Sequence, residues 1–285
     1  MTRPPEELRN YHGALFTPAQ RYAFAVAGKL RLRPAFYSAW AKLKTPRSDI
    51  LPFRDKHAGQ RCFIMGGGPS LKLIDPEPLR HEFTFGVNGI FLIFDWLGFQ
   101  PTYYAVEDWL VYEDRQQEIA ARITAPQCFF PLQFAKPGFT KPNHHYMNAF
   151  YDFAPIPDWP RFSTDLARQI WIGGTVTYVC LQLAYYMGFH EVYLIGMDHN
   201  YAKPDHVQTK GREWTSQGAD PNHFHPDYFG KGYRWHDPMV ERMEVAYRKA
   251  RRVYEADGRR VFNATVGGKL EVFDRVDFAT LFPKD

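Results

Sequence analysis

Three glycines, a proline and a serine interrupt the chain directly after a short apolar run. Residues 61–65 are followed by Gly66, Gly67, Gly68, Pro69 and Ser70. Glycines permit positive φ and close approach of a ligand, and free N–H groups at the start of the following helix attract anions. The stretch matches neither G-x-G-x-x-G nor G-x-x-x-x-G-K-[ST]. Both a phosphate cradle and a plain strand-to-helix turn therefore fit the glycines alone.

A second glycine-rich helix start lies at Gly173, Gly174 and Thr175. Apolar residues follow it at helical spacing until Gly188, a residue typical of the position after a helix. We therefore expect a helix here, with a second candidate anion site at its start.

Histidines gather in one part of the chain. Five of the 11 histidines are His199, His206, His223, His225 and His236. The His-x-His pair with Asp198 or Asp227 could bind zinc or manganese, but no helical His-x-x-x-His and no nearby cysteine accompany it, so we expect no dedicated metal site. One histidine acting as a general base is more economical. His236 is the candidate, because Asp237 and Pro238 predict a helix start beside it that should lower its pKa.

Polar residues also follow other short apolar runs. Asn88 is placed where an amide could read a base or sugar edge. Asp108 and Asp198 could each hold a ribose hydroxyl or Mg²⁺, or cap their own loops. No G-x-S-x-G motif supports a serine nucleophile.

Six short β-type runs alternate with helical or loop segments, at 62–65, 84–87, 102–106, 127–131, 191–195 and 260–262. This alternation predicts an α/β fold with a Rossmann-like, mostly parallel sheet and helices on both faces. Ligands of such sheets bind at the carboxyl ends of the strands. The polar and glycine-rich positions above fall at those ends.

We expect the chain to divide into a helical N-terminal extension, 1–58, and a Rossmann-like domain, 59–285, that would bind a nucleotide and carry the catalytic residues. Within the domain, residues 200–235 show no period, and we expect a lid; an ordered insertion without a chemical task is the alternative. A helix should run from Asp237 to Gly258.

Composition narrows the class of protein. The chain has 285 residues, 45% of them hydrophobic, and a mean hydropathy of −0.44, which is typical of a soluble globular protein. Its polar N-terminus lacks the apolar core of a secretion signal, so we expect a cytoplasmic protein. The three cysteines favour no disulfide framework. A net charge of +4 is too small to indicate nucleic-acid binding.

The segment 21–47 is basic and aromatic and contains no acidic residue. It could lie on the inner face of an anionic membrane as a peripheral contact. A solvated helix packed on its own domain is the alternative.

The stretch 64–72 with Ile74 and Asp75, the pair Val87 and Asn88, and the stretch 188–198 together resemble a known superfamily. They are similar to the Campylobacter-type bacterial sialyltransferases (glycosyltransferase family 42) and to the related MptE-like family, named for an archaeal 6-hydroxymethylpterin diphosphokinase. The resemblance covers about 61–282.

The sialyltransferase resemblance implies roles for particular residues. Residues 67–70 would hold the phosphate and ribose of CMP, Asn88 would contact the nucleotide, and Gly173 to Thr175 would support the cytidine pocket. Gly196 and Asp198 match the family well, whereas Asp108 falls near a nucleotide-binding asparagine that this chain lacks. The catalytic base falls on His236. Two tyrosines that steady the departing phosphate have only stand-ins here, Tyr201, Tyr228 and Tyr233.

We therefore expect an inverting glycosyltransferase that needs no cofactor. Its donor would be a nucleotide-activated sugar, with a CMP-linked acidic sugar first in line, and its acceptor a glycan or lipid-linked saccharide in surface-polysaccharide assembly. Two alternatives stay open. One is a Mg²⁺-dependent diphosphokinase that passes pyrophosphate from ATP to a pterin-type alcohol, with Asp108 and Asp198 as metal ligands; the other is a non-catalytic nucleotide-binding protein.

Overall fold

The computed structural model describes residues 47–135, 138–151 and 160–282, together with isolated residues at 19, 22, 23, 26, 27 and 32. Most of the predicted membrane contact, 21–47, and most of the predicted extension, 1–58, lie outside the described residues. The last part of that extension packs into the main core. Ile50 is fully buried, Phe53 of the 3-10 helix η1 (Leu51–Phe53) is buried, and the His57 ring stacks on Phe189 with centroids 4.6 Å apart.

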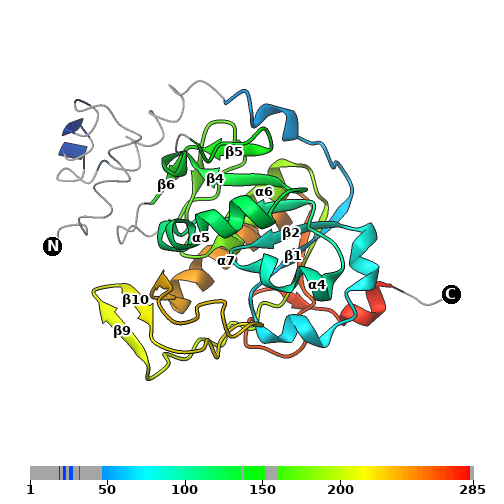
Figure 1. The fold of residues 1–285 in the computed structure, drawn as a ribbon. Helices are drawn as coiled ribbons and strands as arrows, with labels where there is room; N and C mark the ends of the chain where they lie inside the picture. Colours follow the sequence, from blue (N-terminus) through cyan, green and yellow to red (C-terminus); the bar gives the residue numbers. More distant parts are fainter. Residues whose placement is uncertain are drawn as a thin grey trace.

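A fully parallel sheet of eight strands forms the centre of the molecule (Figure 1). Its strands are β1 (Arg61–Met65), β2 (Phe83–Val87), β3 (Tyr103–Ala105), β4 (Gln127–Pro131), β5 (His144–Met147), β8 (Glu191–Ile195), β12 (Arg260–Asn263) and β13 (Asp274–Arg275). The spatial order is β13-β12-β8-β1-β2-β3-β4-β5, with every neighbouring pair parallel. The predicted Rossmann-like class is confirmed, and the predicted runs form six of these strands.

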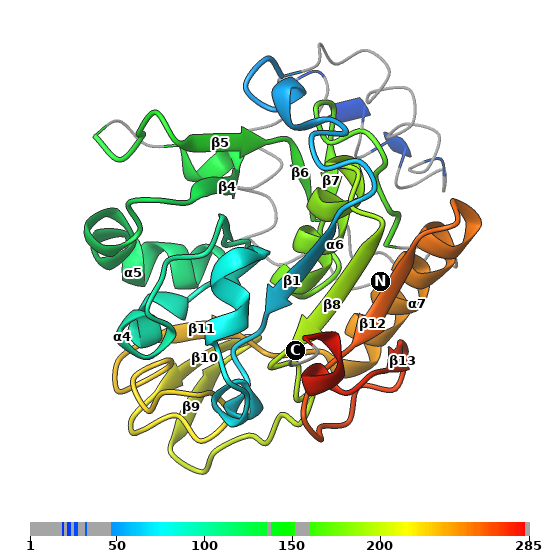
Figure 2. The same cartoon turned by 90° about the vertical axis from the view of Figure 1, so that its right-hand side faces the viewer.

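Alternate residues of β1 face two separate hydrophobic layers. Cys62 and Ile64 pack with the helices α6 (Val176–Tyr186) and α7 (Val240–Ala256) on one face. Phe63 and Met65 pack on the other face with α5 (Trp109–Arg122), the 3-10 helices η4 (Ile90–Ile93) and η6 (Phe278–Leu281), and the short α4 (Phe94–Leu97) beside them. The cartoon in Figure 2 shows helices on both faces of the sheet. Because the strands are buried on both faces, they are continuous apolar runs.

The remaining short elements connect these layers. They are the 3-10 helices η2 (Pro69–Leu73), η3 (Glu77–His81) and η5 (Leu132–Phe134), and the parallel pair β6 (Ala149–Phe150) and β7 (Ile170–Trp171). Among the described helices, none is long and apolar enough to cross a membrane.

The helix predicted after Gly173 to Thr175 is present as α6, and Gly188 follows it with φ +89°. The second predicted helix, α7, starts later than expected. It begins at Val240, with Met239 as N-cap and no side-chain cap, instead of at Asp237 and Pro238. The reason is strand pairing, since the N–H of Asp237 donates to the carbonyl of Arg212 at 2.8 Å and keeps this segment extended.

The stretch 200–235 is not a structureless loop. It contains β9 (Val207–Lys210), β10 (Glu213–Ser216) and most of β11 (Arg234–His236), which form an antiparallel sheet beside the carboxyl edge of the main sheet (Figure 1). The sequence analysis missed this sheet because its strands are short and mostly half-exposed. We call residues 200–236 the insertion.

Arginine contacts attach the insertion to α5. The buried guanidinium of Arg115 donates to the carbonyls of Asp227 and Tyr228, pairs with Glu118, and lies 3.8 Å from the centroid of the Tyr233 ring. Arg234 of β11 pairs with Asp114 and Glu113 of the same helix. The backbone of the insertion is therefore bonded to α5 rather than resting loosely on it.

The strand order reverses between β1 and β8, because the chain moves toward β5 on one side and toward β13 on the other. Such a reversal separates the loops that leave the carboxyl ends of the two strands and creates a crevice there. Gly66 to Ser70 leave β1 at this point, and Gly196 to Asp198 leave β8.

We predict that replacing Arg115 by methionine loosens the insertion. The change leaves two buried carbonyls without a donor, so the free energy of unfolding should fall by roughly 2–4 kcal/mol. Hydrogen exchange should rise across residues 220–236 more than in β1 or β8. The control is Arg122→Met, an exposed arginine of the same helix over the Phe91 ring. Equal exchange in the two variants would contradict this anchoring role.

Candidate functional site

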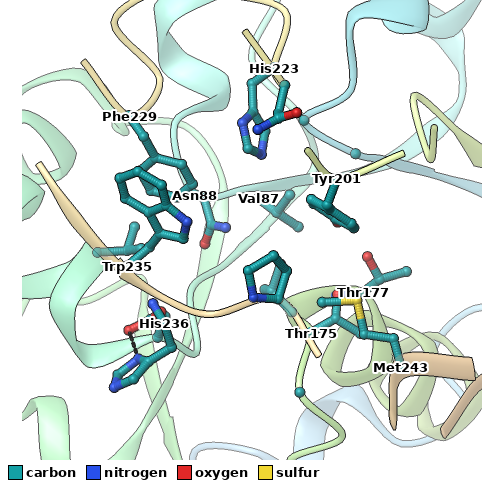
Figure 3. Close-up of a pocket in the computed structure, with 18 of the residues that line it drawn as sticks. Val87, Asn88, Thr175, Thr177, Tyr201, His223, Phe229, Trp235, His236 and Met243 are labelled. Carbon is teal, nitrogen blue, oxygen red and sulfur yellow. Dashed lines mark hydrogen bonds and ion pairs between the residues drawn. The ribbon is translucent and has the colours of Figure 1, made fainter. Parts of the chain in front are cut away.

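A pocket of about 190 Å³ lies at the reversal point, between the strand ends and the insertion (Figure 3). Many of the predicted site residues line it: Gly66, Gly67, Gly68, Asn88, Asp108, Gly174, Thr175, Gly196, Asp198, Tyr201 and His236. Three predicted residues, Pro69, Ser70 and Gly173, are not among the residues that line it. Their binding roles remain predictions.

The glycine loop approaches the end of β8 too closely to carry side chains. A Cβ on Gly68 would lie 1.9 Å from the Asp198 Oδ2 and 2.7 Å from the Gly196 carbonyl oxygen. Gly196 itself has φ +66°, and a Cβ there would lie 2.9 Å from the Leu71 Cβ. Only glycine fits these two positions, because each would otherwise place a side chain against backbone or a fixed neighbour.

The backbone amides of Gly66, Gly68 and Ser70 already have protein acceptors, contrary to the expectation of free N–H groups. Gly66 donates to Ile195 at 2.8 Å and Gly68 to Gly196 at 2.9 Å. The hydroxyl of Ser70 donates to Asp198 Oδ2 at 2.5 Å, with its N–H 3.3 Å from the same oxygen. The following helix is the short 3-10 helix η2, which begins at Pro69. An anion at this loop would therefore lack the donors of these three residues.

His236 is the last residue of β11, and its imidazole hydrogen-bonds to Asp108. The His236 Nδ1 lies 2.9 Å from Asp108 Oδ1, and the His236 N–H donates to Asp108 Oδ2 at 3.0 Å. Asp108 also caps α5 by accepting from the Leu110 N–H at 2.9 Å. An ionised carboxylate only accepts, so Nδ1 carries the proton and Nε2 remains for a substrate.

The pKa of His236 is raised, whereas the sequence predicted that it would be lowered. Burial lowers the pKa, but the hydrogen bond to Asp108 and the negative charge of Asp108 raise it by more. The helix expected beside His236 begins four residues later, so its N-terminus does not dominate.

Glu107 is a buried carboxyl group beside this pair. Burial, and then the charge of Asp108, raise its pKa to about 8. Arg212 and Arg242 act in the opposite direction. At neutral pH Glu107 is therefore mostly protonated and adds little negative charge to the pocket.

The start of α6 forms another side of the pocket. Thr175 caps the helix by accepting from the Thr177 N–H at 3.3 Å, and Tyr247 of α7 hydrogen-bonds to both threonine side chains. Gly173 is a packing residue, since a Cβ there would lie 2.8 Å from the Ala246 Cβ. The helix start therefore faces the pocket through residues 174–177.

Asn88 lies on the floor of the pocket, between His223 and His236 (Figure 3). It has φ +46°, its carbonyl accepts from the Tyr104 hydroxyl at 2.6 Å, and its side chain hydrogen-bonds to Tyr228. The Asn88 Oδ1 is buried and has no hydrogen-bond partner in the described part of the chain. A buried acceptor of this kind favours a ligand that donates to it.

The structure adds a second carboxylate–imidazole pair that the sequence analysis did not single out. His223 Nδ1 lies 2.7 Å from Asp220 Oδ2, and the imidazole stacks on Tyr228 with centroids 4.1 Å apart and planes 2° apart. The D-x-x-H spacing in the insertion was the available signal.

Aromatic side chains form a wall of the pocket that was also missed. Trp109, Trp214, Phe229 and Trp235 line it, and the Phe229 and Trp235 rings stack with centroids 4.5 Å apart. The density of aromatic residues between 201 and 235 was the signal. Aromatic faces of this kind suit the apolar faces of bases or sugar rings.

Metal ligation has no support within the described ranges. No group of three histidine, cysteine or acidic side chains there is placed to hold a metal ion. His225 Nδ1 accepts from the Asp227 N–H at 3.1 Å, while His199 Nε2 lies 3.6 Å from Glu244. The weighed His-x-His site thus divides between a pocket histidine, His223, and a loop histidine, His225.

Comparisons with known proteins place these features in context. A model of the MptE-like family, described as 6-hydroxymethylpterin diphosphokinase MptE-like, matches residues 36–204. None of the curated proteins matches the chain. Among solved structures, the chain is similar to that of the MAf glycosyltransferase from Magnetospirillum magneticum AMB-1, with 15% sequence identity and a TM-score of 0.47. That similarity covers 81% of this chain and 36% of the other, so this chain spans little more than a third of that protein.

We predict that Glu107→Gln stabilises the protein at alkaline pH. The folded pKa of about 8 exceeds the ordinary value of 4.5, so the folded state binds more protons and wild-type stability falls as pH rises between these values. Glutamine removes this fall. The variant should gain on the order of 2–5 kcal/mol in unfolding free energy over wild type at pH 9 relative to pH 5.

Urea unfolding at pH 5, 7 and 9 would measure this difference, with the exposed Glu241→Gln as the control. A Glu107→Gln difference that does not change with pH would show that the carboxyl group is ionised in the folded protein.

Proposed function

The chain belongs to the MptE-like family, as its sequence motifs predicted, and we propose that it is an inverting glycosyltransferase that uses a nucleotide-activated sugar. The single observation that carries this proposal is the Asp108–His236 pair in the pocket at the strand ends. A nucleotide would lie across the carboxyl ends of β8, β1 and β2, where parallel sheets of this kind hold their ligands.

His236 is the proposed general base. With Nδ1 bonded to Asp108, Nε2 can accept the proton of an acceptor hydroxyl as that oxygen attacks the anomeric carbon. Asp108 fixes the ring orientation and stabilises the imidazolium that forms. Because its pKa is raised, His236 is a stronger base than free imidazole.

The nucleotide would contact the polar groups of the floor and the α6 wall. Asn88 Oδ1 suits an amino or hydroxyl donor of the base or ribose. The start of α6 at Thr175 supplies a partial positive charge. Gly67 and Gly68 provide a surface without side chains against which the donor can lie closely.

A CMP-linked acidic sugar is the proposed donor. Arg212 carries the only lysine or arginine side chain among the described residues that line the pocket, and it could pair with a sugar carboxylate. The nearby acidic groups do not rule out an anion: Asp108 pairs with His236, Asp220 with His223, and Asp198 accepts from Ser70. The aromatic wall would receive a glycan or lipid-linked saccharide as acceptor.

A diphosphokinase is the second candidate, because the family description names that activity. It would require Asp108 and Asp198 to bind Mg²⁺ with ATP. Both carboxylates accept hydrogen bonds from the protein in this structure, so they would have to exchange those partners for the metal. We therefore rank this candidate second.

We predict that His236→Gln lowers kcat/KM for transfer from CMP-N-acetylneuraminate by about 10²–10⁴-fold, the usual contribution of a general base. Affinity for CMP should remain within about twofold of wild type. If transfer and donor hydrolysis are both unchanged in the variant, His236 has no catalytic role, and the non-catalytic alternative gains support.

Asp108→Asn should shift the acidic limb of the pH–rate profile, along which the rate rises as His236 loses its proton, to lower pH. Asparagine can still cap α5, but the loss of the negative charge lowers the pKa of His236, so the unprotonated base forms at lower pH. Maximal kcat should fall by about tenfold or more because the ring is less well oriented. An unmoved limb would assign the profile to another group.

A nucleotide panel tests the donor class by thermal shift. CMP, UMP, AMP, GMP and ATP would each be added with Mg²⁺ or with EDTA. We expect CMP to stabilise the protein equally in both, by about 2.7 kcal/mol at 100-fold its Kd. Stabilisation by ATP alone, dependent on Mg²⁺ and lost in Asp198→Ala, would replace the glycosyltransferase with the diphosphokinase.

A further inference from the structure

We propose that His223 binds and stabilises the phosphate of the departing nucleotide, as a second catalytic imidazole opposite His236. This inference rests on the proposed glycosyl transfer and adds the partner for its leaving group. It starts from the finding that the amides of Gly66, Gly68 and Ser70 are already bonded within the protein.

The His223 ring is fixed before any ligand binds. Its Nδ1 bonds to Asp220, and Asp220 in turn accepts from the N–H groups of Asn222 at 2.8 Å and Phe229 at 3.0 Å. The Asp220 side chain is 4% exposed and the His223 side chain 13%. Stacking on Tyr228 holds the plane of the ring. Such a buried, fully bonded arrangement is typical of a preorganised site rather than of a surface ion pair.

His223 lies directly on the glycine loop. A Cβ on Gly67 would lie 2.7 Å from the His223 Cδ2 and 2.8 Å from the Tyr228 hydroxyl. The N–H of Phe224, the next residue, donates to the Gly67 carbonyl at 2.9 Å. The insertion therefore brings an imidazole to the end of β1, where the phosphate of a nucleotide bound at the reversal point would lie.

A phosphate at that position needs positive charge. The amides of Gly66 and Gly68 donate to β8 and its following turn, and the nearest carboxylate, Asp198, repels an anion. Arg212 acts on Glu107 and His236 on the far wall. With Asp220 on Nδ1, the remaining nitrogen of a protonated His223 can donate to a phosphate oxygen as a charge-assisted hydrogen bond.

The two imidazoles stand at opposite sides of the pocket (Figure 3). His223 lies at the end of β1 and His236 bonds to Asp108, three residues after β3, and β2 with Asn88 lies between these strands. Two strand spacings separate those ends by about 10 Å. This spacing suits a single displacement with inversion, in which base and leaving group flank the anomeric carbon from opposite sides, as in inverting glycosidases.

The step balances as a simple substitution. The acceptor oxygen forms a bond to the anomeric carbon and gives its proton to His236 Nε2. The bond from that carbon to the phosphate oxygen breaks, and its electron pair stays on the nucleotide, whose new charge is met by His223. No metal or redox partner enters this step.

The test separates phosphate recognition from the shape of the pocket. Each of CMP, UMP, AMP and GMP is titrated against its own nucleoside by calorimetry in EDTA, with wild type, His223→Gln, Asp220→Asn and His225→Gln. His225 is two residues away, outside the pocket lining, and serves as the matched control. For the best-bound nucleotide, we expect His223→Gln to weaken binding at least tenfold while its nucleoside stays within twofold. Asp220→Asn should fall between wild type and His223→Gln.

The outcomes distinguish this inference from the proposed function. If nucleotide and nucleoside weaken equally in His223→Gln, the residue is structural and the inference is overturned; retained nucleoside binding shows that the variant is folded. If no pair shows a phosphate-dependent advantage in wild type, the inference also fails. If the advantage depends on His223 but CMP-N-acetylneuraminate is not turned over, the phosphate site stands and the glycosyltransferase proposal fails.

Discussion

The close approach of β1 and β8 at their carboxyl ends is the constraint on which the rest of the site depends. The two strands leave in opposite directions there, and hydrogen bonds from Gly66 and Gly68 to Ile195 and Gly196 join the loops that follow. No side chain fits between the loops at Gly68 and Gly196, so backbone lines this part of the crevice. The same bonds occupy the amides of Gly66 and Gly68, which are then not available to a phosphate. The bonds that join the two loops therefore leave fewer amide donors for an anion. Positive charge for a bound phosphate must come from other elements.

Pairing of carboxylates with donors makes an acidic pocket compatible with an anionic ligand. Asp108 and Asp220 each hydrogen-bond to an imidazole, and Asp198 accepts from Ser70. Glu107 is mostly protonated at neutral pH because burial raises its pKa. Each pair is connected to a backbone amide as well, such as Leu110 for Asp108, so the charges are fixed in position. Fixed dipoles and charges stabilise a developing charge without reorganising during the reaction.

Local signals allowed the sheet and α6 to be predicted, because an apolar run ended by a turn, or a helix ended by Gly188, is determined by neighbours in the sequence. The predictions were wrong where a property depends on a residue that is distant in the sequence. The pKa of His236 depends on Asp108, 128 residues earlier, and the start of α7 depends on pairing with Arg212. Ser70 and Asp198 are also 128 residues apart. Their hydrogen bonds occupy the N–H and hydroxyl of Ser70, which were expected to face an anion. The Asp220–His223 pair is local and could have been found from its spacing.

The family match ends at residue 204, before the antiparallel sheet and both of the paired imidazoles. The part of the chain common to the family contains the loops after β1, β2, β3 and β8, whereas the groups proposed to move or neutralise charge come from a later segment. Relatives that share the matched part would share the loops at which we propose a nucleotide to bind, and their reactions could differ with the later segment. That segment contributes Phe224, Tyr228, Phe229 and Trp235 to the buried core, so its divergence would alter core packing as well as the proposed catalytic groups.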